Sequence, residues 1–434
     1  MKSNFKLTLL SGVAAAAVVM AFAGTASATN GYFSNAYGTK AKGMAGAGMA
    51  MPQDTQAAMN NPAGMKKIGN KVEGAVAIFS PLRKYSTAGA AATNFMNDND
   101  QKSSNNIFYV PSFGVNWDMG DYSLGVTLSA NGGMNTDYAT NVFTGGTSGR
   151  TGIDLAQAFL GLTYAHQIDS IHSIGITPTF AAQRFKATGL QGFGSISSDN
   201  TKLTDNGYDY SYGYGVRLGW LGEINDKLTL GAMAQTKMYM QKFDKYAGLF
   251  AEKGDFDIPP TVSFGGSYKV DDKLTMAVDL QRIFYSTVPS IANSHNISVA
   301  SFHTGAGGKI GNNSLGNSQG IGFGWQNMDV VKLGGQYKYS DDLDLRAGIS
   351  HNSAAFSQHE TLFNILAPAV VNTHVSVGGT YDMAPNLALS MSYTHAFNAN
   401  ITGVNVNHIF GGAAAPIDLQ MKQHDFEVGI SYDF

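Results

Sequence analysis

Cysteine is absent from the 434-residue chain, and charged residues make up only 14% of it. Without cysteine, the chain has no disulfide framework and no thiolate metal site. The charged fraction lies well below the roughly one quarter that is usual in soluble globular proteins. The formal net charge is −3 and no basic block occurs, so nucleic acid as a partner has no electrostatic support.

Long apolar runs are also missing, with one exception at the N-terminus. Lys2 and Lys6 give a positive start, residues 7–23 are apolar, and small residues occupy 26–28. This order is typical of a secretory signal peptide. A transmembrane anchor is the alternative, but the run is short for spanning and no second run of about 18 apolar residues follows. We therefore expect residues 1–28 to be a cleaved signal.

Glycine and aromatic residues, by contrast, are abundant, with 52 Gly, 25 Phe and 20 Tyr. They suit the wall and the aromatic girdles of a membrane barrel. In the C-terminal stretch, Phe426, Val428, Ile430, Tyr432 and Phe434 alternate with small or polar residues. Because the side chains of a strand point to opposite faces in turn, this stretch has one apolar and one polar face.

Fourteen stretches of this kind follow one another along the chain. They cover residues 71–80, 106–118, 121–131, 153–167, 171–186, 207–222, 226–242, 258–270, 272–286, 327–339, 341–353, 372–382, 386–398 and 420–434. Tight turns alternate with long connections, as the periplasmic turns and external loops of outer-membrane barrels do. We therefore predict an all-β fold, a 14-stranded antiparallel transmembrane β-barrel over residues 71–434. It would lie in the outer membrane of a Gram-negative bacterium, with both barrel ends on the periplasmic side.

Residues 29–70 differ from the rest of the mature chain. They are rich in Gly, Ala, Met and Asn and show no sustained alternation. A segment this short cannot bury a core of its own, so it must pack against something else. Five methionines are concentrated here: Met44, Met49, Met51, Met59 and Met65. They either line an apolar pocket or pack the segment against the barrel wall, and both roles are compatible.

Several motifs resemble one known family. They are Asn30-Gly31-Tyr32, Asn60-Asn61-Pro62-Ala63-Gly64-Met65, Ile258-Pro259-Pro260-Thr261, Leu343-Asp344-Leu345-Arg346-Ala347-Gly348-Ile349 and Met391-Ser392-Tyr393-Thr394-His395. With the fourteen strands, they resemble the FadL/TodX family of outer-membrane transporters for long-chain fatty acids and hydrocarbons. The resemblance covers essentially the whole mature chain. It implies that residues 29–70 form a partly helical hatch that plugs the lumen, and that hydrophobic molecules enter passively through an external groove and an internal pocket.

The resemblance also implies a lateral exit through an inward kink of the third strand. The kink would fall at Gly132-Gly133, because paired glycines weaken a strand and often mark a bulge. The start of a loop is equally compatible with these glycines. We expect Asn61, Pro62 and Ala63 to pack against the kink as a gate, because proline restricts the backbone and the asparagine amide can satisfy exposed groups.

Two arginines are candidate ligands for a substrate carboxylate. Arg184 and Arg282 lie near the outer ends of predicted strands, roughly where members of the family carry basic residues. Their parity places both among apolar neighbours on the lipid face, where they can snorkel to the interface instead. The sequence does not separate fatty acids from aromatic hydrocarbons as the substrate.

Two other function classes are alternatives. A general porin is disfavoured by the plug-like segment. An enzyme is disfavoured because Gly316-x-Ser318-x-Gly320 matches the hydrolase elbow only within a Gly- and Asn-rich loop. The ten histidines show no metal-ligand spacing, so neither a metal nor a cofactor is expected. We expect a monomer that contacts outer-membrane lipid and lipopolysaccharide, and whose terminal Phe434 is read by the barrel assembly machinery.

Overall fold

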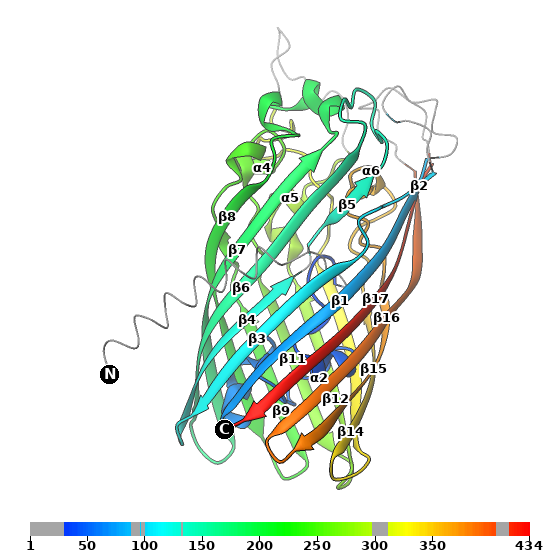
Figure 1. The fold of residues 1–434 in the computed structure, drawn as a ribbon. Helices are drawn as coiled ribbons and strands as arrows, with labels where there is room; N and C mark the ends of the chain where they lie inside the picture. The colour runs from blue at the N-terminus through cyan, green and yellow to red at the C-terminus, as the bar shows by residue number, and fades with distance from the viewer. Residues whose placement is uncertain (1–29, 88–95, 97–99, 132, 297–310, 405–415) are drawn as a thin grey trace.

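One closed antiparallel sheet forms the wall of the protein (Figure 1). The computed structural model describes residues 30–87, 96, 100–131, 133–296, 311–404 and 416–434. The predicted signal and Gly132 lie outside the described residues. The first and last strands close the sheet, with a register from Lys71 opposite Asp433 to Ser86 opposite Asp418.

The strands of the described chain have these bounds. They are β1 (Lys71–Ser86), β2 (Asp100–Lys102), β3 (Phe108–Asp118), β4 (Tyr122–Asn131), β5 (Asn135–Tyr138), β6 (Thr151–Gln167), β7 (His172–Thr188), β8 (Asp209–Glu223), β9 (Leu228–Gln235), β10 (Tyr239–Met240), β11 (Thr261–Lys269), β12 (Leu274–Ile283), β13 (Met328–Lys338), β14 (Leu343–Asn352), β15 (Thr373–Ala384), β16 (Leu387–Val404) and β17 (Pro416–Asp433).

Over the described residues, the wall has fourteen strands, as predicted, when two pairs of short strands are each counted as one. β4 and β5 both pair with β6, and β9 and β10 both pair with β8, so each couple is one interrupted wall strand. The three-residue β2 pairs with the end of β1 and adds a short flap to the wall. The largest extensions beyond the predicted bounds are those of β1 to Ser86 and of β16 to Val404. Both continue beyond the apolar stretch that the sequence pattern detects, because backbone pairing does not require apolar side chains.

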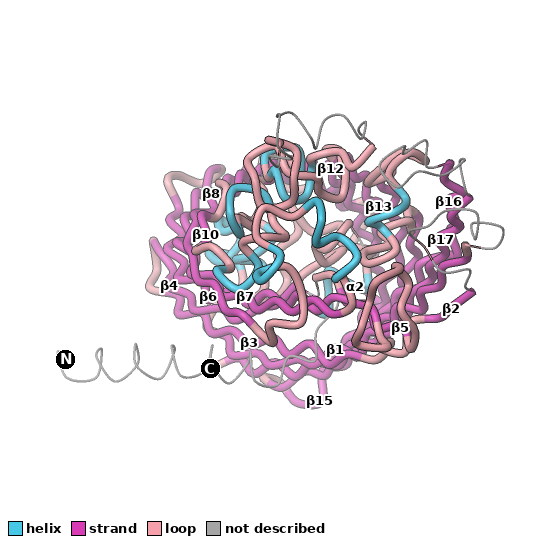
Figure 2. Tube along the Cα trace, turned by 90° about the horizontal axis from the view of Figure 1, so that it is seen from above, coloured by secondary structure: helices cyan, strands magenta, loops and turns pink. Residues whose placement is uncertain are grey.

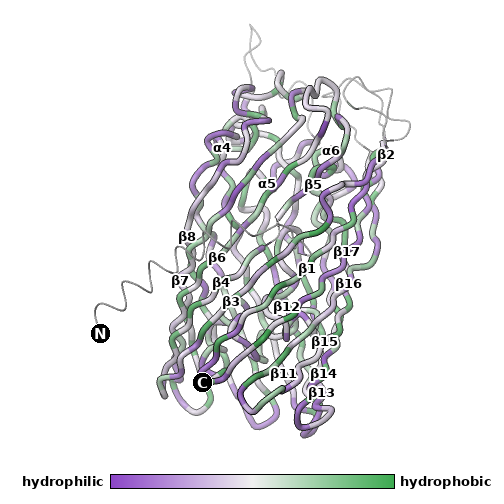
Figure 3. The backbone as a smooth tube through the Cα atoms, in the orientation of Figure 1, coloured by the Kyte–Doolittle hydropathy of each residue, from purple (hydrophilic) through white to green (hydrophobic). Residues whose placement is uncertain are grey.

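The two faces of the wall differ as the alternation requires. On β17, Phe426, Ile430 and Tyr432 are exposed on the outer surface, whereas Asp425 and Glu427 are buried toward the lumen. Figure 3 shows apolar and polar residues alternating along the strands. The outer face is therefore suited to hydrocarbon and the lower inner face to polar contacts.

The two ends of the barrel carry different connections. Tight turns join the strands at the end where the C-terminus lies, and long connections with short helices fill the other end (Figures 1 and 2). The helical turns there are η3 (Gln191–Ile196), η4 (Asn200–Lys202), η5 (Asp244–Tyr246), α4 (Ala251–Gly254), η6 (Tyr285–Thr287), α5 (Pro289–Ala292) and α6 (Thr361–Asn364). Within the described ranges, no helix is both long and apolar enough to cross a membrane.

Residues 30–70, called the hatch below, fold inside the wall (Figure 1). The hatch contains α2 (Thr39–Gly43), α3 (Ala57–Asn60) and η1 (Pro62–Lys67). Lys42 of α2 forms buried ion pairs with Asp425 at 3.0 Å and Glu427 at 2.7 Å, both on β17. Removing one partner from such a cluster leaves a buried charge uncompensated, which costs about 3–5 kcal/mol. These contacts hold the hatch in one position against the wall.

Candidate functional site

The third wall strand contains a bulge between β4 and β5. Asn131 lies opposite Gln157 of β6, and Asn135 lies opposite Asp154. The third strand therefore has one more residue than β6 between these two pairs. Gly133 sits in this bulge with a φ of +96°, and a Cβ there would collide with the carbonyl oxygen of Leu155. The strand continues beyond the bulge, so Gly133 marks a kink within the strand and not the start of a loop.

Pairing between the second and third wall strands stops beside this bulge. The ladder between β3 and β4 runs from Asp118–Ser123 to Phe113–Leu128 and ends there. β3 nevertheless continues to Phe108, held on its other edge by β1. Residues 108–112 of β3 and 129–131 of β4 thus face each other without a ladder in the described chain. We call this interruption the wall opening.

The hatch supplies hydrogen bonds to both sides of the wall opening. The side-chain amide of Gln56 donates to the carbonyl oxygens of Phe113 at 3.1 Å and Leu128 at 3.3 Å, where the ladder ends. Asn131 Oδ1 accepts from the Tyr37 hydroxyl at 2.7 Å and from the Ser34 amide at 3.2 Å. A break in a membrane wall is costly unless its backbone groups are satisfied, and the Gln56 amide reduces that cost.

The Asn61-Pro62-Ala63 motif packs elsewhere, so the expectation that it contacts the kink is wrong. The Asn61 amide donates to the carbonyl oxygen of Trp220 on β8 at 2.9 Å and to that of Met49 at 3.0 Å. A Cβ on Gly219 would collide with this motif. The motif fits where inward-facing glycines on β7, β8 and β9 leave room, namely Gly175, Gly219 and Gly231. Spacing along the sequence does not reveal which strands leave that room.

Both predicted carboxylate ligands face away from the lumen. Arg184 lies 3.8 Å from Asp154 and stacks 4.9 Å from the ring centre of Tyr208 on the outer surface. Arg282 is half-exposed and lies 3.5 Å from Asp329. The structure therefore corrects their assignment to a lumenal ligand and agrees with their parity. Neither can contact a molecule inside the barrel.

An arginine that the sequence analysis missed does face the lumen. Arg83 on β1 is buried, donates through Nη2 to the carbonyl oxygen of Asn105 and stacks 5.8 Å from the ring centre of Phe108. Its Nε has no hydrogen-bond partner. Among the described residues, no carboxylate forms an ion pair with it. The predicted strand ended at residue 80, whereas extending the same odd-numbered inward face to 83 would have found it.

Arg83 lines a cavity beside the wall opening. This space of about 270 Å³ is also lined by Gly133 and Met134 of the bulge, by Trp325 and by Ala369. A buried guanidinium with an unused N–H is suited to bind an oxyanion. The cavity thus joins an anion-binding group to apolar walls, next to the interruption in the barrel.

The part of the lumen at the loop end is apolar. A cavity of about 310 Å³ lies among residues of β6, β7 and the loops. Its lining comprises Ile153, Phe185, Leu190, Leu249, Phe250, Ser290, Leu315, Ile321, Gly322, Phe323, Phe363 and Leu366. No charged side chain is among them. Such a cavity favours an apolar ligand through the area removed from water.

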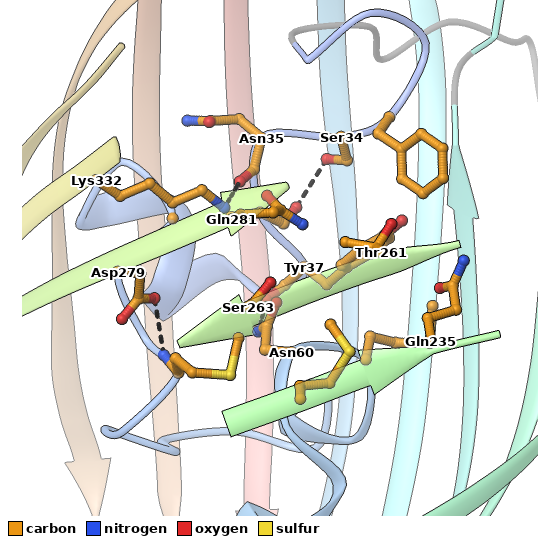
Figure 4. A pocket seen from close by; sticks show the side chains of 16 residues that line it. Ser34, Asn35, Tyr37, Asn60, Gln235, Thr261, Ser263, Asp279, Gln281 and Lys332 are labelled. Carbon is orange, nitrogen blue, oxygen red and sulfur yellow. Dashed lines mark hydrogen bonds between the residues drawn. The ribbon is translucent and has the colours of Figure 1, made fainter. Parts of the chain in front are cut away.

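The lumen becomes polar where the hatch begins (Figure 4). A cavity of about 520 Å³ between hatch and wall is lined by Asp279 and Lys332 among other polar groups. Asp279 accepts from the Met49 amide at 2.9 Å, and Lys332 donates to the Asn35 carbonyl oxygen at 2.8 Å. Met49 and Met59 also line this cavity, whereas Met44 and Met65 pack hatch against wall. Met44 and Met65 thus have the predicted packing role, whereas the cavity that Met49 and Met59 line is polar and is not the predicted apolar pocket.

The hydrolase-elbow match has no supporting context, and the described residues form no metal-binding group. Ser318 is exposed in an irregular loop, without the strand-to-helix turn that the hydrolase elbow requires. No group of three or more His, Cys, Asp or Glu side chains there could hold a metal ion. The candidate functional features are the apolar cavity, the arginine cavity and the wall opening.

The chain is similar in sequence and in structure to known outer-membrane proteins. The chain is 23% identical to outer membrane protein P1 of Haemophilus influenzae over 310 residues, which are 63% of this chain and 62% of that relative. The toluene transporter TodX of Pseudomonas putida matches 92% of this chain and 99% of its own, with a TM-score of 0.67 and 17% identity. A FadL homologue of Pseudomonas aeruginosa matches 93% of this chain and 100% of its own, with a TM-score of 0.69 and 17% identity.

The structural likenesses support the fold. The family model described as "Outer membrane protein transport protein (OMPP1/FadL/TodX)" matches residues 19–434, which is nearly the whole chain. The tight-turn end is then the periplasmic end and the loop end the extracellular one. The chain belongs to the OMPP1/FadL/TodX family of outer membrane transport proteins.

Proposed function

We propose that the protein carries long-chain fatty acids, or related hydrophobic compounds, across the outer membrane by passive diffusion and releases them sideways into the bilayer. The observation that carries this proposal is the end of the β3–β4 ladder at Phe113–Leu128, beside a cavity lined by the bulge. An apolar molecule in the upper lumen meets a polar, hatch-filled lower lumen. Lateral release keeps each methylene out of water, a gain of about 0.8 kcal/mol.

Arg83 favours a substrate that carries a carboxylate. A buried guanidinium without an acidic partner is costly, and a bound carboxylate would offset that cost. Its cavity also touches the wall opening, so the headgroup of a fatty acid could rest there while its chain occupies apolar space. An aromatic hydrocarbon is the second candidate, because Phe185, Phe250, Phe323 and Phe363 offer ring surfaces in the apolar cavity.

A reversible cross-link can test the lateral route. The chain has no cysteine, so Ser112→Cys with Ser129→Cys introduces a unique thiol pair. These residues would face each other if the ladder continued past Phe113 and Leu128. We expect oxidation to abolish uptake of labelled oleate by cells and reduction to restore it. Thiol counting would establish that the cross-link forms.

A matched pair within the intact ladder serves as the control. Val115 and Val126 already lie opposite each other on β3 and β4. Cross-linking Val115→Cys with Val126→Cys should leave uptake unchanged. If the oxidised Ser112→Cys/Ser129→Cys variant takes up oleate at the same rate as its reduced form, release sideways is excluded. Passage through the lumen is then the better route.

We further propose that the terminal aromatic residue guides assembly. Phe434 is half-exposed at the periplasmic end, and its amide donates to the Asn70 carbonyl oxygen at 3.2 Å. An accessible ring at the end of the closing strand is available to the barrel assembly machinery. The transport unit is proposed to be a monomer, since one chain closes the wall by itself.

A further inference from the structure

Three lysines gather on the outer surface near the extracellular rim. Lys84 of β1 lies directly opposite Lys102 of β2. Lys422 of β17 lies opposite Leu82, two residues before Lys84 on β1. All three occupy even-numbered positions near the rim, where the even-numbered side chains of β1 and β17 point outward. Neighbouring strands thus place three ammonium groups on one patch, called the lysine patch below.

The lysine patch borders a cavity whose lining, among the described residues, includes no acidic side chain. This cavity is open to solvent and comprises about 740 Å³, and its nine lining residues include the three lysines and Arg83. Asn398 and Gln420 add amide groups to the lining. The only ion pair that a described residue makes with the patch is Asp100 with Lys84 at 3.0 Å, at an exposed position. Like charges directly opposite each other destabilise paired strands, so the patch favours a bound anion.

The height of the lysine patch matches the outer boundary of the membrane. Lys422 lies ten residues along β17 from Tyr432, which is exposed near the periplasmic end. Ten residues of a strand tilted by about 40° rise roughly 25 Å, the height of the apolar band of such barrels. Between them, Phe426 and Ile430 present apolar side chains to the outside. The patch therefore sits where the headgroups of outer-leaflet lipids lie.

We propose that the lysine patch binds the phosphate groups of an anionic glycolipid of the outer leaflet, such as the lipid A part of lipopolysaccharide. The lysines neutralise the phosphates, and Asn398 and Gln420 are placed to bond sugar or phosphate oxygens. Leu82 and Phe426 lie below to contact acyl chains. Basic clusters at the membrane surface recognise phosphorylated lipid headgroups in this way. The three lysines lie on the outer face of the wall, whereas Arg83, which also lines this cavity, faces the lumen.

Binding of diphosphorylated lipid A to the purified barrel in detergent tests the proposal. The variant replaces Lys84, Lys102 and Lys422 by glutamine. We expect roughly a hundredfold weaker binding, because each lysine near an anionic lipid surface strengthens binding by roughly fivefold and the variant loses three. Lipid A without its phosphates should bind the wild-type barrel as weakly as the intact lipid binds the variant. Inorganic phosphate alone should not compete at millimolar concentration, which distinguishes the lipid from a free anion.

A second lysine cluster provides the matched control. Lys227, Lys269 and Lys273 are exposed around neighbouring periplasmic turns. Replacing these three by glutamine changes the net charge equally and should leave lipid A binding unchanged. Heat-modifiable migration on a gel would show that both variants fold. Equal binding by the lysine-patch variant and the wild type, or equal loss in the control variant, would overturn the assignment.

Discussion

Gln56 of the hatch donates its side-chain amide to the backbone carbonyl oxygen of Phe113, the last residue of β3 that pairs with β4. The same amide also reaches Leu128, the strand partner of Phe113. One buried side chain therefore bridges the two wall strands at the point where they separate. The hatch does more than fill the lumen, because it defines the edge of the wall opening.

Replacing Gln56 by leucine should loosen that edge. The change removes both hydrogen bonds from the hatch to these carbonyl groups, each worth about 1 kcal/mol. We expect faster hydrogen exchange in residues 108–113 and 128–131, with β17 unchanged. Gln53→Leu is the control, since Gln53 accepts from Arg346 on the far side of the hatch. Equal protection of the opening in the wild type and the Gln56 variant would contradict this role.

Gly133 should tolerate no side chain. Valine there would adopt a left-handed backbone and collide with the Leu155 carbonyl, so the bulge must rearrange. We expect oleate uptake to fall at least tenfold at equal surface amounts, because the kink shapes the wall opening. Gly120→Val is the control, since Gly120 has a φ of +87° but nothing within 4 Å of a Cβ. Loss of uptake in both variants would assign the effect to backbone strain alone.

The barrel could be predicted from the sequence because its signals repeat. Alternation fixes which side chains face lipid, and the regular switch between tight and long turns fixes strand number and direction. The same parity placed Arg184 and Arg282 on the outer face, which the structure confirms. Such features depend on residues close together in the chain, so they can be recognised from a single sequence.

The site was predicted less well because it depends on contacts between distant residues. Gln56 meets Phe113 and Leu128 only after the wall has closed around the hatch. Arg83 was missed because apolar alternation ends before the strand does. The Asn61 motif was placed against the wrong strands, since its space is created by glycines on β7, β8 and β9. None of these contacts produces a repeating pattern in the sequence from which it could be predicted.

Asn61 should hold the hatch against β8. Its side chain donates to Trp220 and Met49 and accepts from the Ala63 amide at 3.2 Å, which caps η1. Replacing Asn61 by alanine leaves those groups unpaired, so the hatch should become more sensitive to proteolysis within residues 50–67. The wall should keep its heat-modifiable folding because its ladders do not include this residue. Uptake of oleate should fall, and wild-type uptake by a variant with a loosened hatch would separate hatch anchoring from transport.

Arg83 offers the sharpest test of the substrate. Replacing it by glutamine keeps a polar group in the cavity but removes the charge, so a carboxylate should lose about 2 kcal/mol of binding, or roughly thirtyfold. Direct binding of oleate and of toluene to the purified barrel would separate the candidates. If the natural ligand carries a carboxylate, oleate affinity should fall while toluene affinity stays the same.

Arg184→Gln is the matched control for that experiment. Arg184 also stacks on an aromatic ring and also lies near the extracellular end of its strand, but it faces outward. Its replacement should change neither affinity, because no molecule inside the lumen can reach it. Oleate binding that is insensitive to Arg83→Gln, with toluene the tighter ligand, would identify an uncharged hydrocarbon as the substrate. In that case the wall opening and the lateral route would still stand, since they depend on the β3–β4 ladder and the bulge and not on this guanidinium.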